Sequence, residues 1–120
     1  QGLRAVMGPA GRREPWARLA YRPEIESALA RLRDGRLCCV YGNRTRRQIL
    51  ARYSPDRGQT WGREWLLRHD FQSIDDDPDL GYPRLAQRAD GHLLVLYYWA
   101  TRDHPQQHIA ATIWDPGRRE

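Results

Sequence analysis

Residues 32–41 read LRDGRLCCVY and residues 87–97 read QRADGHLLVLY, so each stretch places an Asp-Gly dipeptide just before an apolar run. Both residues of Asp-Gly tolerate the positive φ of a tight turn, and strand-like residues flank each dipeptide. Each stretch therefore predicts a β-hairpin, with turns at Asp34-Gly35 and Asp90-Gly91.

Further strand-like runs follow both hairpins. Residues 48–53 and 108–114 predict a third strand in each copy, and residues 64–68 predict a fourth strand in the first copy. The second copy ends before a corresponding fourth run appears. Two self-similar units of short antiparallel strands are typical of the blades of a β-propeller.

A helix competes with a strand over residues 24–32, which contain good helix formers. The matching residues 82–87 include Pro83 and lack a helical pattern, so the repeat favours a strand. We expect an all-β fold made of an irregular N-terminal segment, a four-stranded antiparallel blade and a second, incomplete blade. Their expected bounds are residues 1–20, 21–70 and 71–120.

The composition excludes several classes of protein. A chain of 120 residues with 40% hydrophobic residues suits a small globular unit rather than a disordered chain. The longest apolar run, residues 93–100, is far shorter than the roughly 20 residues of a membrane-spanning helix, so we expect no membrane partner. No secretory leader opens the sequence, which begins with Gln1. We therefore expect a mature product or a fragment, with the compartment left open.

The formal charge is +5, and all 20 basic residues are Arg. A basic balance is typical of nucleic-acid binding, but these Arg residues are scattered rather than clustered. Exclusive use of Arg indicates codon bias in a GC-rich genome, and we expect no nucleic-acid partner. Cys38 and Cys39 alternate in direction on a strand, which argues against a mutual disulfide, and no clustered His accompanies them.

Two other groups of residues resemble metal ligands without matching a known site. Residues 75–79 offer acidic oxygens but lack the spaced ligands and Gly of a calcium loop, so a solvated loop is favoured. His104 and His108 stand four apart, yet Pro105 denies them one helical face for zinc. We expect no metal and no cofactor.

A stapled turn is predicted after the third strand of the first copy. Residues 54–61 read SPDRGQTW and match the Asp-box, Ser-x-Asp-x-Gly-x-Thr-Trp, at every defined position. Asp56 is expected to accept hydrogen bonds from loop N–H groups, and Gly58 to adopt a backbone angle that other residues avoid. The predicted structural set comprises Ser54, Asp56, Gly58, Thr60 and Trp61, with Trp61 as the apolar anchor.

The order of residues around this turn resembles that of the sialidase (neuraminidase) family. In bacterial sialidases a catalytic Glu, a hairpin Asp-Gly, a substrate-binding Arg and an Asp-box follow one another. Glu26, Asp34, Arg44 and residues 54–61 stand in that order here. A later sialidase blade begins with the catalytic Tyr, and Tyr82 takes the corresponding place before the second Asp-Gly.

This resemblance covers about residues 22–116 and implies two blades of a six-bladed sialidase-like propeller. It implies hydrolysis of terminal sialic acids of the exo-α-sialidase type, with Glu26 and Tyr82 as catalytic residues. The anomeric carbon of a sialic acid bears a carboxylate, which repels an anionic nucleophile, whereas a neutral Tyr activated by Glu avoids that repulsion. Arg binds the substrate carboxylate bidentately. Arg44 is the first candidate, followed by Arg52 and Arg84.

The chain also departs from the family pattern. The spacing from Asp34 to Arg44 is two residues longer than usual, and the Glu and Tyr copies are adjacent where sialidases place another blade between them. The general acid and the first Arg of the family have no counterpart in this sequence. We therefore expect a piece of a longer hydrolase that is inactive alone, whose partners are an acidic glycan such as a sialoside and either the remaining blades or further copies of itself.

Alternatives remain for each of these residues and for the function. Glu26 is alternatively a solvated carboxylate at a strand end, and Tyr82 a packing aromatic before a proline. Trp99 is expected to pack within a blade or to stack on a sugar. The alternative function is a non-catalytic carbohydrate- or protein-binding Asp-box propeller. Sheet faces that neighbouring blades would cover are expected to expose Val95, Tyr97, Trp99 and Ile113.

Overall fold

The structure, a computed structural model, describes residues 25–117, so the segment predicted to be irregular, residues 1–20, lies outside the described part. Regular structure within residues 25–117 consists of strands, and no helix is present there that is able to cross a membrane. The strands are β1 (Ile25–Arg31), β2 (Leu37–Asn43), β3 (Gln48–Ser54), β4 (Trp65–Arg68), β5 (Gly81–Gln87), β6 (Leu93–Trp99) and β7 (His108–Trp114).

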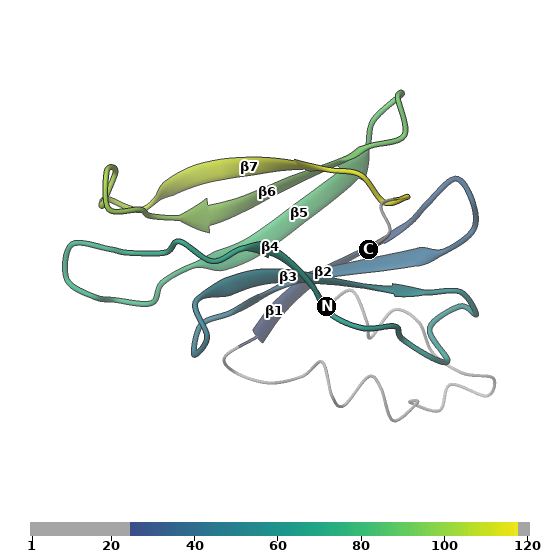
Figure 1. The fold of residues 1–120 in the computed structure, drawn as a ribbon, viewed down its shortest axis with the longest axis horizontal. Coiled ribbons are helices and arrows are strands. Elements are labelled where there is room, and N and C mark those ends of the chain that lie inside the picture. The colour runs from purple at the N-terminus through teal and green to yellow at the C-terminus, as the bar shows by residue number, and fades with distance from the viewer. Residues whose placement is uncertain (1–24, 118–120) are drawn as a thin grey trace.

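These strands form two antiparallel sheets that lie one above the other (Figure 1). The first has the order β1-β2-β3-β4 and the second the order β5-β6-β7. Strand β5 crosses beside β1 and β2, so the first strands of the two sheets are neighbours. The all-β prediction is confirmed, and β1 is the strand that the repeat favoured over a helix. The second sheet has three strands, and the two sheets do not close into a ring.

Both predicted hairpins are present, and their turns have the same geometry. Gly35 and Gly91 adopt φ values of +95° and +93°, which glycine reaches without steric cost. The carboxylates of Asp34 and Asp90 each accept a hydrogen bond from the backbone N–H two residues later, at 3.0 Å in both turns. The Asp side chain and the Gly backbone together explain why this dipeptide ends one strand and begins the next.

The hydrophobic core lies between the two sheets. The first sheet contributes Cys38, Val40, Ile49 and Ala51, and the second contributes Leu93, Val95, Tyr97 and Trp99. The largest of these side chains, Trp99, is fully buried and contacts Phe71 edge to face, with ring centroids 5.2 Å apart. Burial assigns Trp99 to packing and leaves no face of its ring for a sugar.

The expected exposure of the second sheet is therefore partly wrong. Val95, Tyr97 and Trp99 point into the core, whereas Ile113 is half exposed as expected. Side chains alternate between the two faces of β6, and residues 93–99 are apolar on both faces. The sequence therefore does not indicate which of the two faces packs against the first sheet. The exposed set of the second sheet includes Leu96, Ile109 and Ile113.

Arg33 links the two Asp-Gly turns through its side chain and its backbone. The guanidinium of Arg33 donates hydrogen bonds to the carbonyl oxygens of Arg88 and Ala89, at 2.9 and 3.1 Å. The backbone N–H of Arg33 donates to the side-chain oxygen of Gln87 at 2.8 Å. These bonds hold the equivalent turns of the two copies together at one end of the molecule.

Candidate functional site

The residues proposed for chemistry gather at the end of the molecule opposite the Asp-Gly turns. The β2–β3 turn, the segment from β4 to β5 and the β6–β7 loop all lie at this end, on the left in Figure 1. Arg44 follows β2 directly, and Tyr82 is the second residue of β5. The strand order thus brings two residues that are far apart in sequence to the same end of the molecule.

A close backbone contact holds the two sheets together at this end of the molecule. Gly42 of β2 lies so near Gly81 of β5 that a Cβ atom on Gly42 would be 2.8 Å from the Gly81 Cα. Real Cβ atoms do not approach a backbone atom this closely, so only glycine permits the observed spacing. The first residue of β5, Gly81, is therefore held against Gly42 near the end of β2.

Tyr82 occupies an unusual backbone conformation. Its φ is +49°, and Gly81 before it has φ +107°. Tyr82 and Pro83 together oppose the single residue Tyr97, which makes a β-bulge at the start of β5. Positive φ at a bulky residue costs energy and re-aims the side chain. Tyr82 is 46% exposed, and its ring contacts that of Tyr98 edge to face, with centroids 6.1 Å apart.

Arg44, Tyr82 and Asp79 form a three-residue cluster. The Arg44 guanidinium carbon lies 4.9 Å from the centre of the Tyr82 ring, within the range of a cation–π contact. The Tyr82 hydroxyl donates a hydrogen bond to Asp79 Oδ1 at 3.1 Å. Arg44 Nη2 lies 4.0 Å from the same oxygen, and Arg44 Nε donates to the Leu80 carbonyl oxygen at 3.3 Å. A phenol, a carboxylate and a guanidinium are therefore within contact of one another near the surface.

The backbone of Glu26 lies close to this cluster. Glu26 pairs with Gly42 in the β1–β2 ladder, and Gly42 is the residue that touches Gly81. Glu26 and Tyr82 therefore lie near the same end of neighbouring strands. The Glu26 side chain lies outside the described part of the structure, so the predicted pairing of the two side chains remains a prediction.

The other two candidate Arg residues are not part of the cluster. Arg52 pairs with Cys39 and lies beside Tyr41 and Glu64, on the face of the first sheet that points away from the second sheet. Arg84 is exposed, pairs with Leu96 on the outer face of the second sheet, and donates to the Pro83 carbonyl oxygen at 3.0 Å. Of the three candidate Arg residues, Arg44 is the one that reaches Tyr82.

A second tyrosine–carboxylate pair was not predicted from the sequence. The Tyr41 hydroxyl donates a hydrogen bond to the Glu64 carboxylate, which also accepts one from Arg46 at 3.1 Å. The hydrogen bond from Tyr41, followed by that from Arg46, lowers the pKa of Glu64. Burial and the nearby carboxylate raise the pKa of Tyr41, which keeps this phenol protonated. The pair links β2 to the start of β4. Tyr41 and Glu64 are too far apart in sequence for their spacing to predict the contact.

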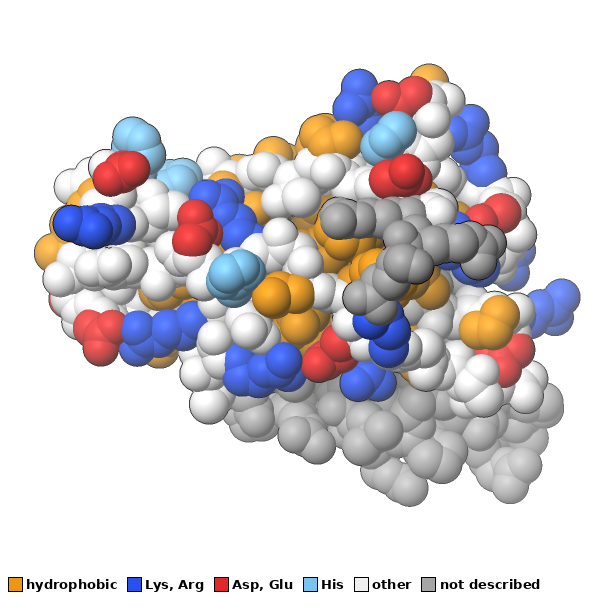
Figure 2. Space-filling view, viewed as in Figure 1, with side chains coloured by type: hydrophobic (Ala, Val, Ile, Leu, Met, Phe, Trp, Pro, Cys, Tyr) orange, Lys and Arg blue, Asp and Glu red, His pale blue; other side chains and the backbone are white. Residues whose placement is uncertain are grey.

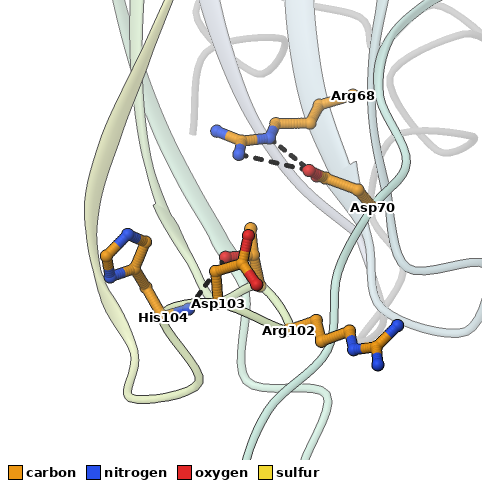
Figure 3. A pocket seen from close by; sticks show the side chains of 6 residues that line it. Arg68, Asp70, Arg102, Asp103 and His104 are labelled. Atoms are coloured by element: carbon orange, nitrogen blue, oxygen red, sulfur yellow. Dashed lines mark hydrogen bonds and ion pairs between the residues drawn. The ribbon is translucent and has the colours of Figure 1, made fainter.

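A polar pocket of about 540 Å³ lies at the same end of the molecule, between β4 and the β6–β7 loop (Figure 3). Arg68 and Asp70 form an ion pair on one wall, with Nε and Oδ1 2.8 Å apart. Asp70 also accepts a hydrogen bond from the Trp99 indole at 2.9 Å, and Arg68 donates to the Tyr97 hydroxyl at 3.1 Å. This wall is thus joined to the core, whereas Arg102, Asp103 and His104 on the opposite wall come from a loop.

The Asp-box turn lies at the other end of the molecule, since Ser54 pairs with Leu37 directly after the first Asp-Gly turn. Asp56 Oδ1 accepts hydrogen bonds from the Thr60 N–H at 2.8 Å and from the Ser54 hydroxyl at 2.9 Å. The fully buried Ser54 hydroxyl accepts one from the Gly58 N–H at 2.7 Å. The box residues staple their own turn and do not touch the Arg44–Tyr82–Asp79 cluster.

The two thiols and the candidate metal ligands also form no part of the cluster. Cys38 and Cys39 are unbonded and buried, and burial raises the pKa of each to about 12. Within residues 25–117, His, Cys, Asp and Glu side chains form no group of three or more that would hold a metal ion.

Comparisons with protein-family models, with curated proteins and with solved structures find no match to this chain.

Proposed function

We propose that this chain forms two blades of a sialidase-like propeller and contributes the nucleophile and one carboxylate-binding Arg to an exo-α-sialidase-type glycoside hydrolase. The observation that carries the proposal is the contact between Arg44 and Tyr82. These residues were selected for different chemical roles and lie in different copies of the repeat. The fold brings them together across the two sheets.

The arrangement of the sheets supports the assignment to blades. The two copies place equivalent hairpins side by side, with β1 and β5 as neighbouring first strands. The sheets stack face to face around a shared core, as consecutive blades do. The Asp-box lies at the end opposite the cluster, which agrees with a role in stapling the turn rather than in binding substrate.

The chemistry proposed for Tyr82 concerns its phenol oxygen, on a residue that is 46% exposed. Its oxygen forms a bond to the anomeric carbon while the bond from that carbon to the leaving oxygen breaks. The phenolic proton passes to a carboxylate, for which the resemblance supplies Glu26. The leaving oxygen takes a proton from an acid contributed by another part of the ring, and water then releases the sugar from Tyr82.

Arg44 is proposed to bind the carboxylate of the sugar. Its guanidinium is half-buried, is held over the Tyr82 ring, and is fixed through Nε by the Leu80 carbonyl. A fixed guanidinium loses little freedom on binding an anion. Asp79 Oδ1 lies 4.0 Å from Arg44 Nη2, whereas a carboxylate bound bidentately would lie within hydrogen-bond distance of the guanidinium.

The test has two parts. Binding of N-acetylneuraminic acid to this chain is followed by NMR, and Arg44→Gln should weaken it by roughly 10- to 100-fold, the value of a charged hydrogen-bonded contact. Arg84→Gln is the matched control, because Arg84 lies outside the cluster. The methyl ester of the sugar lacks the negative charge, so the unmodified chain should bind it as weakly as Arg44→Gln binds the free acid. Turnover of a fluorogenic sialoside is measured on the longest natural polypeptide that contains the chain, with and without Tyr82→Phe.

Retained binding with no turnover by that longer polypeptide would favour the non-catalytic carbohydrate-binding alternative. Equal effects of Arg44→Gln and Arg84→Gln would remove the proposed role of the cluster. Full turnover by Tyr82→Phe would remove Tyr82 as nucleophile while leaving the binding proposal to stand on the first part.

A further inference from the structure

The last strand of the second sheet, β7, is the equivalent of β3 in the first. Both have seven residues, and both pair with the second strand of their sheet, β2 or β6, in the same register. Ser54 pairs with Leu37 as Trp114 pairs with Leu93, and the opposite ends of the two ladders also correspond. An edge of β7 therefore corresponds to the edge of β3 that binds β4.

The two edges differ in their occupancy. Ile49, Leu50 and Ala51 of β3 pair with β4, whereas no strand within residues 25–117 pairs with the outer edge of β7. Orange side chains lie along the upper border of the molecule in Figure 2, where Figure 1 places β7. An edge that carries unpaired N–H and C=O groups is a template for another strand.

The sequence of β7 lacks the features that prevent edge pairing. Residues 108–114 read HIAATIW and contain no Lys, Arg, Asp, Glu or Pro. Ile109 and Ile113 are 69% and 50% exposed, and Ala111 between them is also exposed. Natural edge strands are normally guarded by charge, proline or a bulge, and β7 has an unbroken ladder with β6.

The exposed residues of β7 are also self-complementary. When two copies of β7 pair antiparallel about Ala111, Ile109 of each copy lies opposite Ile113 of the other. Directly opposed β-branched side chains stabilise an antiparallel pair, and no like charges meet along the strand. The same twofold arrangement continues the hydrogen-bonded ladder of each sheet into that of its neighbour.

We propose that the outer edge of β7 binds β7 of a second copy of this chain, giving a twofold dimer with one continuous sheet across the two molecules. The interface is isologous, since one strand pairs with its own copy. The dimer does not use the proposed catalytic residues, because neither Arg44 nor Tyr82 takes part. It is proposed for this chain by itself, since in a longer propeller a fourth strand of the second blade would take the β7 edge, as β4 takes the edge of β3.

Sedimentation velocity at increasing protein concentration tests the proposal. The unmodified chain should form a dimer, and Ile109→Lys or Ile113→Lys should give a monomer, because either variant places a charge opposite an isoleucine of the second copy. Ile74→Lys is the matched control: Ile74 is 68% exposed but lies between β4 and β5, so the dimer should persist. Circular dichroism verifies that each variant is folded.

A second comparison separates edge pairing from packing of the outer sheet faces. Leu96 is 38% exposed on the central strand β6, where a lysine leaves the β7 edge free to pair. Loss of the dimer in Leu96→Lys with retention in Ile113→Lys would overturn the proposal, as would a monomeric unmodified chain. Hydrogen exchange should show amides of β7 that become protected as the dimer forms, and concentration-independent exchange would also contradict it.

Discussion

Replacing Gly42 by Ala tests the backbone contact that joins the two sheets at the candidate site. Replacing a strand glycine of ordinary φ by Ala normally stabilises a protein by about 0.4–1 kcal/mol, because it lowers the conformational entropy of the unfolded chain. Here the added Cβ would lie 2.8 Å from the Gly81 Cα, with Leu80 and Ile49 side-chain atoms at 3.5 and 3.6 Å. The nearest obstacle is backbone, which cannot rotate away.

Overpacking of this kind costs about 1–3 kcal/mol and exceeds the gain from the unfolded state. We expect Gly42→Ala to lower the free energy of unfolding by about 1–2 kcal/mol, which corresponds to roughly 4–8 °C in Tm per kcal/mol for a domain of this size. Urea unfolding followed by tryptophan fluorescence measures the change. Binding of N-acetylneuraminic acid should also weaken, because β5 carries Tyr82 and has to move away from Arg44.

Gly62→Ala is the control for this experiment. A Cβ on Gly62 meets only the Tyr53 carbonyl oxygen at 3.6 Å, an ordinary contact, so this variant should be neutral or slightly stabilised. If Gly42→Ala were as stable as Gly62→Ala, the close contact would not hold the sheets in place. The explanation of the site by glycine-limited spacing would then be wrong.

Two further predictions concern polar groups away from the cluster. Ser54→Ala should destabilise the chain by about 1–3 kcal/mol, because the buried Gly58 N–H loses its acceptor, and Gln59→Ala in the same turn should have little effect in the same urea assay. Hydrogen bonds from Arg68 lower the pKa of Asp70, so Asp70 stabilises the fold above the pKa of the unfolded carboxyl, about 4. The stability difference between the unmodified chain and Asp70→Asn should therefore shrink as pH falls below about 4, and a constant difference across that range would contradict the assignment.

Strand positions followed closely from local sequence, because turn residues and alternation act over a few positions. The Asp-Gly turns placed both hairpins, and residues 108–114 form β7 with the predicted bounds. The fourth strand begins at Trp65 rather than Glu64. Glu64 instead places its carboxylate on Tyr41 and Arg46, a set of contacts that depends on the β2–β3 turn as well as on the local sequence.

The candidate site was less predictable than the strands. The order of residues around the Asp-box points to Arg44 and Tyr82, and the structure places these two side chains in contact. The hydrogen bond between Tyr82 and Asp79 depends on positive φ at Tyr82 itself, which sequence does not indicate for a bulky residue. The sequence ranks Arg52 and Arg84 behind Arg44, and their positions on β3 and β5 place both outside the cluster.

The shared core has a consequence for how this chain folds. Val40 and Ile49 of the first sheet are buried in one cluster with Val95 and Tyr97 of the second, so neither sheet buries this face without the other. Arg33 adds long-range bonds that form only when both hairpins are in place. The cooperative unit of folding is therefore the pair of repeats, and native-state hydrogen exchange should find β2 and β6 opening together at one free energy rather than sheet by sheet.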